Sequence, residues 1–182
     1  MKTRSLYLIP TSALLLCALI GAAPKAPHAA ATAVPRTVPN LAAMQMFMGT
    51  WHCSQPLRGK TRTDTATTTM TLDGQYMMTR DVSPPFDQYR HIPQVINSYM
   101  TYNPINKMWV TIGVDNFGGY FVNTSPGWSG NTIRTTTKMT NDGSSGYDVL
   151  TKLSETKTTD RFVTKDPKGK VTTATITCTK SG

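Results

Sequence analysis

The chain is poor in glutamate, histidine and recognisable catalytic motifs. Glu155 is the only glutamate among 182 residues, and from Gly49 onward the helix-poor composition favours strands. Neither His52 nor His91 has a second histidine or a carboxylate at ligand spacing, so no metal site is predicted. A G-x-S-x-G elbow, a P-loop and a dinucleotide fingerprint are all missing. We therefore predict no catalytic residues and no cofactor.

The N-terminal residues predict export. Lys2 and Arg4 precede a mostly apolar run over 6–23, and small residues follow, as in a secretory signal peptide. Cleavage is expected near Ala31, with Ala23 as the alternative. A membrane anchor is the competing interpretation, but Pro10 leaves the run short of the ~20 apolar residues of a span. We predict a signal peptide over 1–31, a linker over 32–40 and one secreted or periplasmic domain over 41–182.

The chain is basic, with a formal net charge of +9. The leader holds three basic residues and no acids, so the mature domain carries about +6. Lysine and arginine form no run and do not alternate with aromatic residues. This favours a soluble basic surface over an anionic partner, and predicts no nucleic-acid partner. Oligomeric state is left open.

Two cysteines stay in the domain when Cys17 leaves with the leader. In an exported chain, Cys53 and Cys178 are expected to form a disulfide. The bond would join the first and last strand segments and stabilise the domain by nearly ~5 kcal/mol in the chain-entropy model. A metal pair is the alternative, and only His52 lies close enough in sequence to assist it.

From Gly49 onward the chain is rich in threonine, and β-branched residues favour strands. Short turns, such as Asp73-Gly74, join the segments and imply antiparallel neighbours. We predict an all-β fold, a single antiparallel up-and-down β-barrel of about ten strands with one short N-terminal helix over 41–48. The expected strands are 49–55, 61–72, 75–82, 94–103, 108–115, 119–124, 130–140, 146–154, 158–165 and 170–179.

Alternation of apolar residues predicts which side chains face the interior. Expected inward rows are 51/53, 66–72, 108–114, 133–139, 147–153 and 174–178, each taken at every second residue. A tight turn pairs Met70 with Met77 and sends Arg80 outward, whereas a bulge would bring Arg80 inward to meet a carboxylate. An interior lined by methionine, threonine and tyrosine can leave space for one small apolar ligand, although a filled interior stays open. The expected ligand contacts are Met70, Met77, Tyr99, Val110, Ile112, Thr135 and Tyr147.

One connection, over 83–93, is long and holds three prolines, so it is expected to cover a barrel mouth. Gly-rich turns near Phe117 and Trp128 suit ligand entry, with tight turns and a barrel cap as the structural alternative. The predicted mouth or lid residues are Phe86, Tyr89, Arg90, His91, Phe117 and Trp128. Acid–base work by Asp81, Asp87, Arg90 and His91 at that mouth is the enzymatic alternative.

Gly49-Thr50-Trp51 at the start of a strand resembles the G-x-W signature of lipocalins and related calycin barrels. With Phe117-Gly118-Gly119 and Pro126-Gly127-Trp128-Ser129-Gly130, the chain is similar to bacterial lipocalin-like domains over about residues 41–180. These are related in architecture to nitrobindins and fatty-acid-binding proteins. The resemblance implies a barrel with Trp51 packed at its base.

The chain departs from both relatives at their ligand-holding residues. Nitrobindins hold haem through a histidine near the C-terminus, and no histidine follows His91. Fatty-acid-binding proteins need inward arginines, and Arg80 and Arg134 oppose the predicted alternation. The expected function is therefore an exported barrel that binds a small hydrophobic molecule. A haem protein or small enzyme, and a filled structural barrel, are the alternatives.

Overall fold

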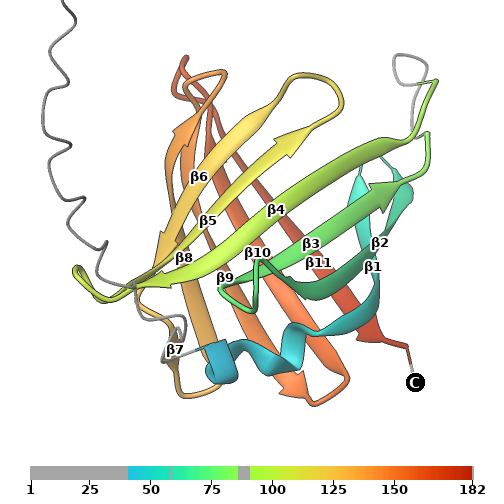
Figure 1. Ribbon diagram of the computed structural model, residues 1–182. Coiled ribbons are helices and arrows are strands. Elements are labelled where there is room, and N and C mark those ends of the chain that lie inside the picture. Colours follow the sequence, from blue (N-terminus) through green and yellow to red (C-terminus); the bar gives the residue numbers. More distant parts are fainter. Residues whose placement is uncertain (1–40, 58, 86–90, 182) are drawn as a thin grey trace, which may run out of the picture. The chain divides into compact units, whose positions relative to one another are not determined.

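The computed structural model describes residues 41–57, 59–85 and 91–181 and shows an all-β protein (Figure 1). The predicted signal peptide and linker, and Phe86, Tyr89 and Arg90, lie outside these residues. The chain begins with a short 3-10 helix, η1 (Leu41–Phe47), as expected over 41–48. The strands are β1 (Gly49–Leu57), β2 (Lys60–Thr71), β3 (Tyr76–Ser83), β4 (Gln94–Asn103), β5 (Met108–Asp115), β6 (Tyr120–Ser125), β7 (Trp128–Ser129), β8 (Thr132–Thr140), β9 (Ser145–Ser154), β10 (Lys157–Lys165) and β11 (Val171–Lys180).

The strands form a closed antiparallel barrel. Successive strands are neighbours from β1 to β6 and from β8 to β11, and the two-residue β7 adds to β8. The wall closes through the pairings β1–β11 and β6–β8. Cys53 lies opposite Cys178 in the β1–β11 register, and their sulfurs are bonded. The predicted barrel, its strand count and its first-to-last disulfide are confirmed.

The β2–β3 connection sets which residues of β3 face inward. Residues 72–75 make the turn, and Gly74 N donates to Thr71 O at 3.1 Å. Asp73 and Gly74 both take the left-handed backbone conformation, which aspartate and glycine adopt more readily than most residues. Met70 pairs with Met77, which is the predicted simple register. Arg80 is therefore exposed on the outer wall rather than buried.

Some of the predicted inward rows are confirmed in part, and others are wrong. Trp51, Cys53, Ala66, Thr68 and Cys178 face the interior as expected. In β5 the inner face carries Trp109 and Thr111 instead of the row 108–114, and in β9 it carries Asp148 and Leu150 instead of the row 147–153. In β8 the prediction holds at Ile133 and Thr135 but fails at Met139. A register shift between Val122 and Asn123 of β6 turns Met139 outward.

The errors in β5 and β8 lie where the outer wall carries apolar side chains. Cross-strand pairing places five apolar residues in one row across β3, β4, β5, β6 and β8. Three of them are well exposed, at 37% for Tyr99, 49% for Ile112 and 50% for Met139. Apolar alternation in this part of the chain therefore marks the outside of the barrel. The row consists of Met78, Tyr99, Ile112, Val122 and Met139.

Helix η1 closes one end of the barrel. Leu41 and Met44 are buried and pack with Met77, Trp109 and Ile133. Three side chains from the barrel hydrogen-bond to carbonyl groups of the helix, whose ends otherwise leave such groups unpaired. The bonds are Trp128 Nε1–H to Ala43 O (2.8 Å), Trp51 Nε1–H to Phe47 O (3.2 Å) and Lys180 Nζ–H to Met46 O (3.2 Å). The described part of the chain holds no helix of the length and apolarity that a membrane crossing needs.

Candidate functional site

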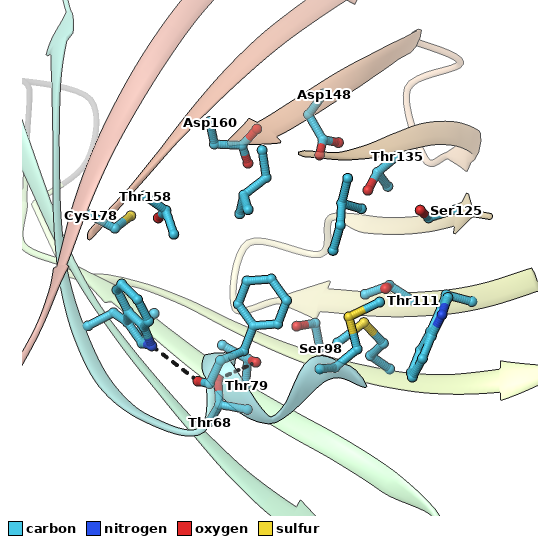
Figure 2. Close-up of a pocket in the computed structure, with 18 of the residues that line it drawn as sticks. Thr68, Thr79, Ser98, Thr111, Ser125, Thr135, Asp148, Thr158, Asp160 and Cys178 are labelled. Atoms are coloured by element: carbon cyan, nitrogen blue, oxygen red, sulfur yellow. Dashed lines mark hydrogen bonds between the residues drawn. The ribbon is translucent and has the colours of Figure 1, made fainter. Parts of the chain in front are cut away.

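A cavity of about 310 Å³ lies inside the barrel next to η1. Its walls combine large apolar side chains with a ring of hydroxyl groups, and Figure 2 shows the labelled hydroxyl residues pointing into it from strands around the barrel. The main apolar residues are Met44, Phe47, Trp51, Met100, Trp109, Ile133 and Leu150. The hydroxyl residues are Thr68, Thr79, Ser98, Thr111, Ser125, Thr135 and Thr158.

Hydroxyl groups of the wall find partners within the protein. Thr68 Oγ1 lies 2.8 Å from Thr79 Oγ1 on the neighbouring strand, and Ser125 Oγ accepts a hydrogen bond from Gly127 N at 3.1 Å. Threonine and serine whose hydroxyls are paired present mainly carbon to the space they line. These parts of the wall therefore suit an apolar ligand.

Two carboxyl groups, on Asp148 of β9 and Asp160 of β10, also point into the cavity (Figure 2). The β9–β10 register pairs Asp160 with Leu150, two residues from Asp148, so the two aspartates are diagonal neighbours on the inner face. Of the cavity-lining residues, these two alone are ionisable, because Cys53 and Cys178 are bonded to each other. They give an otherwise uncharged cavity one acidic side.

Burial changes the ionisation of both carboxyl groups. It raises the pKa of Asp160 from 3.8 to about 8, and the negative charge of Asp148 adds to that rise. Burial also raises the pKa of Asp148 to about 6, where the hydrogen bond from Thr135 opposes it. Near pH 7 the pair thus shares about one negative charge, because Asp148 is mostly ionised and Asp160 mostly protonated. Perturbed carboxyl groups facing a cavity are typical of functional sites.

A separate polar network lies on the inner face of β2, β3 and β4, toward the end opposite η1. Arg62 Nε–H donates to Asp64 Oδ1 at 3.0 Å, and Arg62 also donates to Gln94 Oε1 at 3.3 Å. Ser83 donates to Asp64 and accepts from Arg62. Burial and the neighbouring Asp64 raise the pKa of Asp81 to about 6, which Arg62 partly offsets. The inward arginine that meets a carboxylate is therefore Arg62, not Arg80.

The predicted ligand contacts divide between the two faces of the barrel. Thr135 lines the cavity, and Met77 is buried in the core beside it. Met70 shares the inward parity of Thr68 but is 37% exposed. The other four lie on the outer wall, and Arg134 stacks on one of them, with its Cζ 3.7 Å from the ring centroid of Tyr147. These outer residues are Tyr99, Val110, Ile112 and Tyr147.

The predicted mouth residues that the structure describes lie at both ends of the barrel. His91 and Phe117 are exposed and lie near the β3–β4 and β5–β6 connections. Trp128 lies at the opposite end, where its ring stacks on Phe47 of η1 with centroids 6.0 Å apart. Its indole therefore caps the closed end, which is the structural alternative given for it.

Sequence reasoning missed Asp148 and Asp160, although a signal was present. Aspartate is depleted in strands, yet both lie in the middle of predicted strands. The neighbours Tyr147 and Val149 formed a more apolar alternate row, which assigned Asp148 to the outside. An aspartate within a strand is itself evidence of a local partner or of a site.

No model of a known protein family matches the chain, and no curated protein is similar to it in sequence. Across the described residues, no group of three or more histidine, cysteine, aspartate or glutamate side chains is arranged to hold a metal ion. The barrel and its short helix agree with the architecture that the calycin resemblance implies.

Proposed function

We propose that this protein is an exported, lipocalin-like binding protein that holds one small, largely apolar molecule inside its barrel. The observation that supports it most directly is the cavity of about 310 Å³. Protein interiors are normally packed without voids of this size, because empty space costs stability. Ligand pockets span about 300–1,000 Å³, so a small ligand fits this one.

The disulfide supports the proposed location. A bond between Cys53 and Cys178 indicates an oxidising, extracytoplasmic environment. The N-terminal basic, apolar and small-residue regions are consistent with delivery to that environment. We propose more specifically that the protein is secreted or released into a periplasm.

A pair of adjacent substitutions in β2 tests the binding proposal. Ala66 lines the cavity, whereas Thr67 lies beside Arg80 and Met78 on the outer wall. Ala66→Phe fills interior space, and Thr67→Phe adds the same ring outside. Binding of naphthylmethanol, a small neutral probe, to each protein is measured by equilibrium dialysis.

We expect the wild type and Thr67→Phe to bind the probe with similar affinity, and Ala66→Phe to lose binding by at least about tenfold. Circular dichroism checks that both variants keep the strand content of the wild type. Absence of probe binding to the wild type, or equal binding to all three proteins, would contradict the proposal.

A further inference from the structure

The acidic side of the cavity indicates the charge of the ligand that fits it. We propose that the molecule bound in the barrel is a small amphipathic amine, whose positively charged nitrogen lies against Asp160 and Asp148 and whose apolar part packs against Trp51, Trp109 and Leu150. This inference rests on the proposed binding function and adds the charge of the ligand to it.

The first argument is an unpaired buried oxygen. Asp160 Oδ1 is buried and has no hydrogen-bond partner among the described residues. Asp160 lines the cavity, so a ligand placed there lies against its carboxyl group. Buried polar atoms in native proteins are almost always hydrogen-bonded, and leaving one unpaired is costly. An ammonium group, which has several N–H donors and a positive charge, would pair with this carboxyl group.

The second argument is the position of the basic side chains. Arg134 and Arg161 lie on the strands that carry the two aspartates or next to them, yet both are exposed, and Arg134 stacks on Tyr147 of the outer wall. None of the residues that line the cavity is basic. In a chain with a net charge of +9, the cavity is therefore locally acidic. Such a cavity attracts a cation and repels an anionic ligand such as a fatty acid.

The third argument is the aromatic lining. Phe47, Trp51 and Trp109 face the same cavity as the aspartates. The faces of aromatic rings attract cations and also bury apolar surface. A molecule with an apolar body and one charged nitrogen uses both properties of the wall, whereas a purely apolar molecule offers the carboxyl groups of Asp160 and Asp148 no partner.

Three naphthalene probes of similar size and different charge test the inference: naphthylmethylamine, naphthylmethanol and naphthoate. Binding of each probe to the mature protein at pH 7 is measured by equilibrium dialysis. We expect the amine to bind more than about tenfold tighter than the alcohol, and naphthoate to bind most weakly. The double variant Asp148→Asn/Asp160→Asn is expected to bind amine and alcohol alike. Asp73→Asn, which removes an exposed carboxylate from a turn, should retain the preference of the wild type.

A calorimetric measurement gives a second readout that needs no variant. A bound cation favours the ionised form of Asp160, so amine binding at pH 7 should release protons, and the apparent enthalpy should depend on the ionisation enthalpy of the buffer. Binding of the alcohol should show no such dependence.

The outcomes separate the two proposals. Equal affinity for amine and alcohol, or a preference for naphthoate, overturns the cation inference while the binding function stands. Amine preference that survives in the double variant, or amine binding without proton release, also overturns it. Failure of all three probes to bind the wild type contradicts the binding function itself and the inference with it.

Discussion

Asp160→Asn should make the protein more stable at pH 8 and should remove most of its pH dependence between pH 6 and 8. Burial raises the pKa of Asp160 from 3.8 to about 8 in the folded protein. In the unfolded chain the carboxyl group releases its proton near pH 4, whereas in the folded state it keeps the proton until about pH 8. The folded state therefore binds more protons, and the free energy of unfolding falls as pH rises through this window.

The magnitude follows from the pKa difference. One pKa unit corresponds to about 1.4 kcal/mol, so ionised Asp160 costs the folded state about 5–6 kcal/mol in full. Between pH 6 and 8 the wild type should lose about 2–3 kcal/mol. Asp148 and Asp81, whose pKa values are raised to about 6, titrate mainly below this range. As these two groups ionise, the free energy of unfolding falls between about pH 4 and 6. The variant keeps both groups and shows the same fall.

Urea unfolding at pH 6 and pH 8 measures the effect through the midpoint and slope of each transition. The variant should show nearly equal free energies of unfolding at the two pH values, and Asp73→Asn should follow the wild type. If the wild type is equally stable at both, or if Asp160→Asn declines by the same amount, the ionisation argument for the cavity is wrong.

Two further predictions concern the closure of the barrel. Replacing Cys53 and Cys178 by serine removes a cross-link between residues separated by 125 positions, and should lower the free energy of unfolding in urea by about 3–5 kcal/mol. Reduction of the wild type should cause the same loss. A wild type whose stability is unchanged by the reductant would contradict the prediction. Trp128→Phe keeps an aromatic ring beside η1 but removes the 2.8 Å hydrogen bond to Ala43 O. It should lower stability in thermal or urea melts by about 0.5–1.5 kcal/mol, whereas Trp128→Phe equal to wild type would show that this bond adds nothing.

The strand order could be predicted from sequence because its determinants are local. Threonine-rich runs end at turns such as residues 72–75, and most strand limits differ from the expected ones by one or two residues. The first-to-last pairing is long-range, but Cys53 and Cys178 mark it. Local turn chemistry and one covalent bond were therefore enough for the topology.

The lining of the cavity could not be predicted in the same way. The alternation rule assumes that apolar residues face inward, and this fails at Ile112, which is 49% exposed while Thr111 lines the cavity. It fails again at Tyr147, whose neighbour Asp148 points inward. A hollow interior with polar groups needs fewer apolar side chains than a packed core. The two faces of a strand therefore differ little in hydropathy. The register shift that turns Met139 outward depends on the pairing of β6 with β8, which no local pattern reveals.

The pairing of β1 with β11 also determines when the protein can fold. The N-terminal strand has no second neighbour until residues 171–180 are present, so the wall cannot close on a growing chain. Contacts so distant in sequence make formation slow, because a long loop must be ordered before they form. A product truncated before β11 would expose the edges of both β1 and β10, and free edges promote aggregation. Closure of the barrel therefore depends on its last ten residues.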